Sequence, residues 1–250
     1  MTTRKIVIGD LHGCVDEFME LVDLLGYSRE SDQVVLVGDL MDRGPDPLGC
    51  IRYARESGFT VVKGNHEEKH HRYWRHEQRV RNEMAAGVRR PKKNPMTTLT
   101  GPRGVVNASL TEADVEWLEK LPLMVWLSET FVVVHAGLEP AYRMPAQSNS
   151  VLRVRYVGAD GRMRDLDHLE NTTYWSETWK GPESVAYGHA VHSLETPRVD
   201  KFEGGACYSV DTGCVYGGHL TALVLEDGHE PEFVQVKAHR EYYSPSAPRE

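Results

Sequence analysis

Short apolar runs alternate with longer helix-like stretches along the first third of the chain. Three apolar runs have the length of buried strands, and they cover residues 5–8, 33–37 and 59–62. Each is followed by a helical pattern, and these patterns cover residues 15–25, 47–58 and 66–87. In the first pattern Val15, Phe18, Val22 and Leu25 share one helix face, and Gly26 ends it. This repeated strand–helix order predicts a layered α/β sheet.

The remainder of the chain has a weaker pattern. Residues 88–110 are rich in Pro, Gly, Thr and Lys and predict a loop, whereas residues 111–122 predict a helix capped by Thr111. Residues 140–182 predict mainly loops, with a hairpin near residues 152–164. The other apolar runs predict paired strands at 123–127 and 130–137 and closing strands at 184–189, 206–213 and 220–226. We expect one domain over residues 1–240 and a disordered tail over residues 241–250.

Composition narrows the class of protein. The 250 residues are 40% hydrophobic and 26% charged, which is typical of a soluble globular protein. A net charge of -8 and a pI near 5.8 give no general signal for nucleic-acid or membrane binding. One basic stretch, residues 87–95, is the exception. The four cysteines lack metal-knuckle spacing, and no apolar run suits a signal peptide or membrane span, so we expect free thiols and a cytoplasmic location.

Polar, metal-binding side chains follow the end of five predicted strands. They are Asp10 and His12; Asp39, Asp42 and Arg43; Asn65, His66 and Glu67; His135; and His189. Ligands of open α/β sheets bind beyond the carboxyl ends of the strands, where these residues can converge. Burying such charges is costly unless something of opposite charge offsets it.

The mixture of side chains indicates a metal centre. Carboxylate and amide oxygens together with imidazoles suit Mn²⁺, Fe or Zn²⁺ better than Ca²⁺. Two such ions about 3.5–4 Å apart can stabilise the attacking and leaving oxygens of a phosphoryl transfer, with a water bound by the ions as nucleophile. Arg43 offers a planar pair of donors for a phosphate. The sequence therefore predicts a two-metal phosphoesterase.

The motifs GDLHG, GDLMDRG, GNHE, HAG and GH resemble those of the calcineurin-like metallophosphoesterases, in particular the phosphoprotein-phosphatase branch. Met41 stands where that branch usually has valine, which keeps the position apolar. The resemblance implies a four-layer α/β/β/α sandwich, with two mixed sheets flanked by helices. It also implies two divalent metal ions, with Mn²⁺ expected and Co²⁺, Fe or Zn²⁺ as alternatives.

The same resemblance implies a role for each matching residue. Asp39 would bridge the two metals, and His66 would act as general acid, oriented by Asp42. Arg43 would hold the substrate phosphate. The remaining metal ligands would be Asp10 and His12 at the first ion and Asn65, His135 and His189 at the second.

Two later stretches, residues 149–163 and 209–227, resemble segments of bacterial diadenosine tetraphosphatases. By that resemblance Arg153 or Arg155 would be a second phosphate-binding arginine, and alternation along a strand would send both to one face. The implied substrate is a dinucleoside polyphosphate such as diadenosine tetraphosphate, cut symmetrically to two ADP. The sequence indicates no membrane or strong nucleic-acid partner, and it leaves the oligomeric state open.

Three other functions remain open. A phosphoprotein phosphatase acting on serine, threonine or tyrosine uses the same chemistry, although the chain is short for protein-docking surfaces. Decapping or trimming of RNA 5′ ends also breaks a phosphoanhydride. A non-catalytic phosphate sensor is disfavoured because the ligand set is intact.

Several other polar residues are interpreted as structural. His70 and His71 are expected on a solvated helix face leading away from the site, and His192 is expected near the site without binding metal. Cys14 is expected to pack at a helix start, although its neighbourhood could also make it redox-sensitive. Asp211 is expected in a tight turn that closes the sheet, and residues 87–95 are expected to form an exposed loop rather than a polyphosphate or RNA site.

Overall fold

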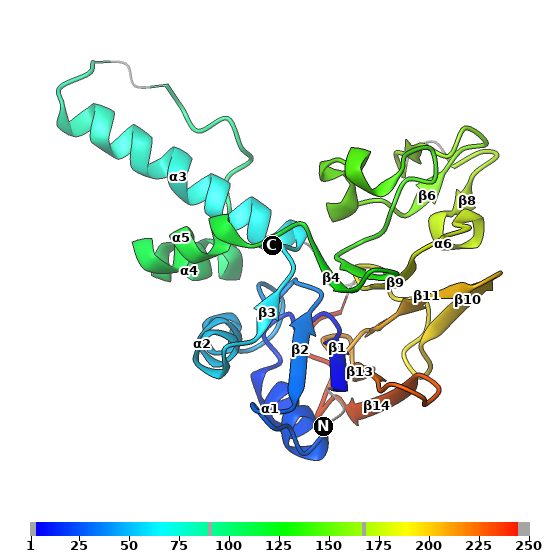
Figure 1. Ribbon diagram of the computed structural model, residues 1–250. Coiled ribbons are helices and arrows are strands. Elements are labelled where there is room, and N and C mark those ends of the chain that lie inside the picture. Colours follow the sequence, from blue (N-terminus) through cyan, green and yellow to red (C-terminus); the bar gives the residue numbers. More distant parts are fainter. Residues whose placement is uncertain (1–3, 90–91, 167–168, 245–250) are drawn as a thin grey trace.

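The computed structural model describes residues 4–89, 92–166 and 169–244, and it places two mixed β-sheets face to face (Figure 1). The first sheet has the strand order β12-β13-β1-β2-β3, with β14 paired to β13. β1 and β2 pair in parallel, as do β2 and β3, so their carboxyl ends lie at one edge. The strand bounds are β1 Arg4–Ile8, β2 Asp32–Leu36, β3 Thr60–Val61, β12 Asp211–Thr212, β13 His219–Leu225 and β14 Glu232–Lys237.

The second sheet has the strand order β10-β11-β9-β5-β4. β9 pairs in parallel with both β5 and β11, whereas the two outer pairs are antiparallel. The bounds are β4 Met124–Ser128, β5 Phe131–Val134, β9 Ser184–Tyr187, β10 Arg198–Phe202 and β11 Gly205–Ser209. This sheet therefore brings the ends of β5 and β9 to one place.

The alternation of side chains along the strands separates three apolar layers. Val7 of β1 and Val133 of β5 belong to the cluster between the two sheets, whereas Ile6 and Ile8 face the opposite way. Both faces of each central strand are buried, which explains why these strands are apolar throughout rather than alternating.

Helices cover the outer faces of the two sheets (Figure 1). Phe18 of α1 and Ile51 of α2 pack in the cluster on the outer face of the first sheet. Trp175 of α6 is fully buried in the cluster on the outer face of the second sheet, together with the three-stranded unit β7-β6-β8. The bounds are α1 Val15–Leu24, α2 Pro47–Ser57, η1 Met144–Ala146, η2 Asn149–Leu152, β6 Tyr156–Val157, β7 Met163–Arg164, β8 Thr173–Tyr174 and α6 Trp175–Thr178. The predicted four-layer sandwich and the hairpin near residues 152–164 are confirmed.

Three further helices form a lobe at the edge of the first sheet. α3, Asn65–Ala85, begins beside the sheet edge and extends away from it, with α4, Gly101–Ser109, and α5, Glu112–Lys120, packed along it (Figure 1). The prediction of a loop over residues 88–110 was wrong for α4. Its Gly-Pro start resembles a break in structure, but proline fits the first turn of a helix because that N–H needs no helical partner. Thr111 caps α5 as predicted.

Two strands and part of the expected tail also differ from the prediction. β10 and β14 are outer, partly exposed strands, and their polar residues give them no clear apolar run.

Residues 241–244 do not form a loose tail, because Glu241 pairs with Tyr216 and the backbone N–H groups of Tyr242 and Tyr243 donate to the carbonyl of Val215. Residues 245–250, and residues 90–91 of the basic stretch, lie outside the described residues. None of the helices in the described part has the length and apolarity that crossing a membrane requires.

Candidate active site

Asp39 lies among the residues that follow the ends of β1, β3 and β5, with His12, His66 and His135 around it. It follows β2 in a left-handed conformation, with φ of 50°, and only 2% of its surface is exposed. The preceding Gly38 has φ of 97°, and a Cβ there would lie 2.6 Å from the backbone of Val62 and Gly64. Because the ends of β2 and β3 approach so closely here, the chain turns after Gly38 and the Asp39 carboxylate faces His12 and His135.

The two oxygens of Asp39 face different imidazoles. Its Oδ1 lies 3.4 Å from Nε2 of His135, whereas its Oδ2 lies 3.6 Å from Nε2 of His12. Two groups of potential ligands share this carboxylate: one contains His135 and His189, and the other contains His12 and His66. Within each group the ligand atoms lie within 4.8 Å of one another. A carboxylate placed in this way can bridge two cations.

The group around His135 brings three potential metal ligands close together. Nδ1 of His135 lies 2.9 Å from the carbonyl oxygen of Val37, so it carries the ring's proton and leaves Nε2 as an acceptor. This Nε2 lies 3.0 Å from Oδ1 of Asn65 and 3.2 Å from Nδ1 of His189. Together with Asp39, these nitrogen and oxygen atoms form a donor set that fits a divalent cation.

The second group has the same tautomer arrangement. Nδ1 of His12 lies 2.7 Å from the carbonyl oxygen of Met41, so Nδ1 carries the ring's proton and Nε2 is an acceptor. The Nη1 of Arg43 donates to this nitrogen, so a positive charge already faces it. Burial lowers the pKa of His12 and of His189 well below the usual value, and lowers that of His135 less. These lowered pKa values favour the neutral ring, which is the form of imidazole that binds a metal.

Asp10 adds negative charge beside these groups. Its carboxylate accepts from the backbone N–H of His189 at 3.1 and 3.2 Å, and a Cβ at Gly188 would lie 1.9 Å from its Oδ1. Burial, with Asp211 and Asp39 nearby, raises the pKa of Asp10 well above the usual value. A cation would relieve this crowding of carboxylates. Asp10 is placed at the edge of the centre, and it is not within 4.8 Å of either group as a whole.

His66 and Asp42 form a buried pair next to Asp39. Nδ1 of His66 lies 2.6 Å from Oδ2 of Asp42, and Nε2 of His66 lies 3.8 Å from Oδ2 of Asp39. Burial alone would raise the pKa of Asp42, but hydrogen bonds from His66 and His70 hold it below the usual value. The imidazole of His66 is therefore held in one orientation by an ionised carboxylate, with Nε2 directed towards the centre.

His70 occupies a place that the sequence interpretation missed. It is fully buried rather than solvated, and its Nε2 lies 2.7 Å from the second oxygen of Asp42. Asn107 of α4 lies 3.1 Å from its other ring nitrogen, and Nε of Arg103 lies 3.2 Å from Asp42. The signal was the i, i+4 spacing of His66 and His70, which places both on one helix face. The next residue, His71, is also covered, because its helix packs on α5; its Nδ1 lies 3.8 Å from Glu119.

Glu67 fixes the backbone that carries Asp39. Its carboxylate is fully buried and accepts from the N–H groups of Gly64, Asp39 and Leu40 at 2.8–2.9 Å. Burial and the nearby Asp39 raise the pKa of Glu67 to about 7. In the GNHE motif, Glu67 therefore holds the backbone around Asp39, whereas Asn65 and His66 are part of the site itself.

Arg43 lies on the outer side of His12 and His66. Its Nη2 is 3.4 Å from Nε2 of His66, and its guanidinium faces the rings of Tyr216 and Tyr243 at 5.5 and 5.9 Å. The two tyrosines come from the β12–β13 loop and from the C-terminal segment, which no local pattern connects to Arg43. Stacking on aromatic rings restricts the guanidinium without neutralising it.

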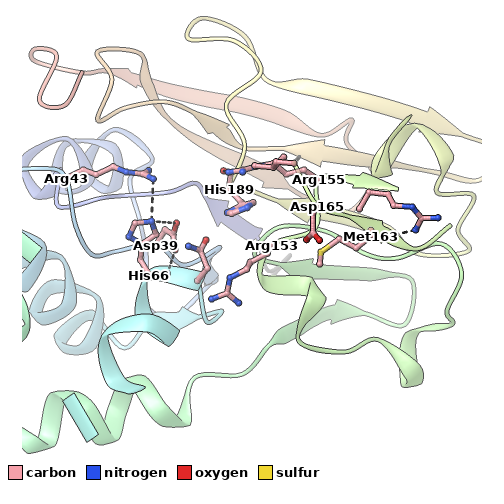
Figure 2. A pocket seen from close by; sticks show the side chains of 11 residues that line it. Asp39, Arg43, His66, Arg153, Arg155, Met163, Asp165 and His189 are labelled. Atoms are coloured by element: carbon pink, nitrogen blue, oxygen red, sulfur yellow. Dashed lines mark hydrogen bonds and ion pairs between the residues drawn. The ribbon is translucent and has the colours of Figure 1, made fainter. Parts of the chain in front are cut away.

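A cavity of about 500 Å³ adjoins the centre (Figure 2). Asp39, His66 and His189 line one end, and Met163 and Asp165 line the other. The remaining lining residues are Arg43, Asn65, Arg153, Arg155, Arg164 and Leu166. Four guanidinium groups along one cavity favour a ligand with several negative charges.

The two arginines that the sequence could not separate both line this cavity, but not on one strand. Arg153 ends the 3₁₀ helix η2, and Arg155 precedes β6, so strand alternation does not apply to them. Nη2 of Arg155 donates to the carbonyl oxygen of His189 at 3.2 Å, whereas Nη2 of Arg153 pairs with Glu68 at 2.8 Å. Arg155 is therefore held beside the metal-ligand group, and Arg153 is held against α3.

His192 and Asp211 stay outside the two ligand groups. His192 packs edge-on against Tyr174, with ring centroids 4.5 Å apart. Asp211 accepts from the N–H of Gly213 at 3.0 Å, and burial raises its pKa to about 6. Asp211 lies in the short strand β12 rather than in the expected turn, which begins after it, and its carboxylate adds to the negative charge around Asp10.

Comparison with known proteins gives consistent matches over nearly the whole chain. Residues 3–232 match the family model described as calcineurin-like phosphoesterase. Serine/threonine-protein phosphatase 1 of Salmonella typhimurium is 28% identical, with 88% of this chain and 91% of that protein aligned. The symmetrical bis(5′-nucleosyl)-tetraphosphatase of Glaesserella parasuis is 26% identical, with 89% and 95% aligned.

A further relative and a solved structure complete the comparison. The asymmetrical bis(5′-nucleosyl)-tetraphosphatase PrpE of Halalkalibacterium halodurans is 30% identical, with 92% of each chain aligned. The crystal structure of "a putative diadenosine tetraphosphatase" superposes with a TM-score of 0.72 at 25% identity, covering 95% of each chain.

Proposed function

Because the chain belongs to the calcineurin-like phosphoesterase family and is a hydrolase of that class, we propose that it hydrolyses phosphoanhydride bonds of dinucleoside polyphosphates. The observation that carries this proposal is the cavity of about 500 Å³ beside the ligand groups, which Arg43, Arg153, Arg155 and Arg164 line. A polyphosphate chain carries several negative charges, and four guanidinium groups around one cavity can pair with them.

The proposed metal ligands are the six residues at the strand ends, with Mn²⁺ as the proposed ion. Asp39 would contact both ions, and the others would be Asp10, His12, Asn65, His135 and His189. Two divalent cations held there supply positive charge against the attacking and leaving oxygens. The neutral imidazoles favour Mn²⁺ or Co²⁺ over Mg²⁺, which prefers oxygen ligands.

His66 is the proposed general acid. Water adds to one phosphorus and gives up a proton to the solvent, the bridging P–O bond breaks, and Nε2 of His66 donates its proton to the oxygen that leaves. Asp42 accepts from Nδ1 at 2.6 Å and so stabilises the protonated ring before the transfer. Arg43, next to His66, is proposed to bind the phosphate so that the leaving oxygen lies within reach of Nε2 of His66.

A symmetrical cut of diadenosine tetraphosphate to two ADP is our proposal for the product pattern. It is supported by the resemblance of residues 149–163 and 209–227 to the symmetrical enzymes. The relatives in the comparison include symmetrical and asymmetrical enzymes at similar identity. The product pattern must therefore be measured on this protein.

A phosphoprotein phosphatase is the second candidate, because one of the similar relatives carries that name. The short chain was expected to disfavour this activity. That argument does not hold, since the alignment to this phosphatase spans 236 residues and 91% of its length. Chain length therefore does not separate the two candidates, and only the preferred substrate can.

One experiment separates these functions. The protein is incubated with Mn²⁺ and, in parallel, with diadenosine tetraphosphate, a phosphopeptide and capped RNA, and the products are identified by chromatography. Two ADP support the proposal, whereas ATP with AMP indicates the asymmetrical cut. Faster release of phosphate from the peptide, or cleavage of the RNA cap, would replace the proposal with the corresponding activity. The Asp39→Asn variant, purified in the same way, controls for contaminating hydrolases.

A further inference from the structure

A second cluster of metal-binding side chains lies apart from the candidate active site. It consists of Cys14, Glu17 and Cys214, each offering one ligand atom, and these atoms lie within 4.8 Å of one another. Cys14 caps the start of α1, Glu17 lies in its first turn, and Cys214 lies in the loop between β12 and β13. All three are buried, with exposed fractions of 0%, 0% and 2%. The fold thus brings the N-terminal and C-terminal parts of the chain together at three buried donors.

Glu17 has one oxygen whose hydrogen-bonding capacity is not used. Its Oε1 accepts from the backbone N–H of His239 at 2.9 Å and from the hydroxyl of Tyr242 at 2.7 Å. Its Oε2, which is equally buried, has no hydrogen-bond partner among the described residues. A buried carboxylate oxygen without a partner is costly, because it has lost its water and gained nothing in return. The two thiols beside it are the groups with which it could share a cation.

The surroundings of the cluster suit a cation rather than a disulfide. A bond between the sulfurs of Cys14 and Cys214 would leave Oε2 of Glu17 unsatisfied, whereas a cation would bind all three groups at once. Cys50 of α2 is also buried, but it does not belong to the group whose ligand atoms lie within 4.8 Å of one another. His239, whose side chain is 49% exposed, contacts Glu17 at 3.7 Å, so the cluster lies close to the surface on this side.

We propose that Cys14, Glu17 and Cys214 form a buried site for one thiophilic divalent cation, with Zn²⁺ as the best match. Two sulfurs and one carboxylate oxygen form a donor set that Zn²⁺ binds well and that Mn²⁺ and Mg²⁺ bind poorly. The site differs in this respect from the active centre, whose donors are nitrogen and oxygen. A cation bound at the cluster can therefore be distinguished from the ions of the active centre by its sulfur ligands.

The position of the cluster gives the bound cation a structural role. Cys14 lies two residues after His12, and Cys214 lies two residues before Tyr216, whose ring faces Arg43. A cation at the cluster would tie the turn that carries His12 to the loop that carries Tyr216. The cation would thereby fix both His12 and Tyr216, which both face Arg43, and its loss would make both segments more mobile.

The first test uses Co²⁺ as a spectroscopic probe on the intact, reduced protein after chelator treatment. Thiolate ligands give cobalt a strong near-ultraviolet charge-transfer absorption, which nitrogen and oxygen ligands do not. We expect wild-type protein to show this band, Cys214→Ser to lose it, and Glu17→Gln to weaken it. Cys207→Ser is the matched control, because Cys207 is equally buried but lies in β11 outside the cluster. That variant should keep the full band.

A second test needs no variant and therefore does not depend on variants folding. Zinc-loaded wild-type protein is treated with an organic mercurial, which displaces zinc from thiolates but not from imidazoles and carboxylates. Release of one equivalent of Zn²⁺ per chain, measured with a metallochromic dye, supports the site. Absence of both the charge-transfer band and this release would overturn it. A Cys14–Cys214 disulfide in the freshly purified protein would also overturn it, because the sulfurs would then hold each other.

Discussion

Nε2 of His70 lies 2.7 Å from Oδ1 of Asp42, while His66 binds the other oxygen of the same carboxylate. Asp42 is therefore held from both sides, and it cannot turn without breaking one of two buried hydrogen bonds. Asn107 donates to the backbone carbonyl of His70 at 2.9 Å and lies 3.1 Å from its Nδ1, which keeps the proton on Nε2. The orientation of His66 thus depends on a chain of contacts that reaches α4.

Loss of His70 should weaken proton donation without removing it. We expect His70→Ala to lower kcat on the order of 10- to 100-fold, with KM and bound metal unchanged, because Oδ1 of Asp42 loses the hydrogen bond from His70. His70→Gln should restore part of the rate, since its side-chain N–H can still donate to Asp42. His71→Ala is the matched control, because His71 lies next to it and faces Glu119 instead. Equal losses in the two alanine variants would show a general effect of the helix rather than support for Asp42.

Replacement of His66 itself should affect only the bond-breaking step. We expect His66→Asn to lower kcat for nucleotide anhydrides by about 10²–10⁴-fold while substrate binding stays near normal. The loss should be much smaller for p-nitrophenyl phosphate, whose leaving group needs little protonation. The measurement is the ratio of variant to wild-type kcat across leaving groups of different pKa. A ratio that stays constant would exclude the general-acid role, and loss of bound metal would make His66 a ligand, as its 3.8 Å distance from Asp39 permits.

Metal removal should abolish activity, and the choice of ion should matter. We expect chelated protein to be inactive, with Mn²⁺ or Co²⁺ restoring more activity than Mg²⁺. Asp39→Asn should be more damaging than a change at His135, because each oxygen of Asp39 faces a different group of ligands. Metal content by elemental analysis should fall at both sites in Asp39→Asn and mainly at one in His135→Ala. Normal turnover with two bound ions in Asp39→Asn would rule out the bridging role.

Arg155 and Arg153 should differ in their effect on substrate binding. Arg155 is held at His189, so we expect Arg155→Ala to raise KM for diadenosine tetraphosphate about tenfold or more through the loss of charge-assisted hydrogen bonds. Arg153 is paired with Glu68 in α3, and we expect Arg153→Ala to raise KM less. Glu68→Gln provides the control, because it frees Arg153 without removing its charge. A larger effect from Arg153→Ala would reverse the assignment.

The ion pair between Arg4 and Asp32 should make stability depend on pH in the acid range. Two hydrogen bonds of 2.9 and 2.6 Å join them, and the bond from Arg4 is the main cause that lowers the pKa of Asp32. The contribution is therefore fully present above the unfolded pKa of about 3.9 and is lost as pH falls through the lower folded pKa.

The corresponding variant should show this dependence directly. We expect Asp32→Asn to lower the free energy of unfolding by about 1 kcal/mol at pH 7, a modest value because Arg4 is partly exposed. The difference from wild type, measured by urea denaturation, should shrink below pH ~4. The exposed Glu30 offers a control in Glu30→Gln, which should change little at either pH. A difference that grows as the solution is acidified would contradict the assignment.

The pattern of the sequence was sufficient for the framework of the fold. The strands carrying Val7, Val35 and Val133 are buried on both faces, so they appear as continuous apolar runs. The residues after them are metal-binding types, and parallel strands end at one edge, so their convergence could be predicted. The pattern failed for β10 and β14, because outer strands keep polar side chains in contact with water.

The tertiary structure decided which residues complete the site. Arg103 contacts Asp42, and Asn107 donates to His70, from a helix whose Gly-Pro start resembles a loop. Tyr243 reaches Arg43 from a segment near the C-terminus, and Cys214 reaches Cys14 across the whole chain. Local propensity and periodicity act over one or two turns of chain, whereas these contacts join segments far apart in sequence. Such contacts depend on how the layers pack, because burial selects the neighbour of a polar side chain only after the layers have come together.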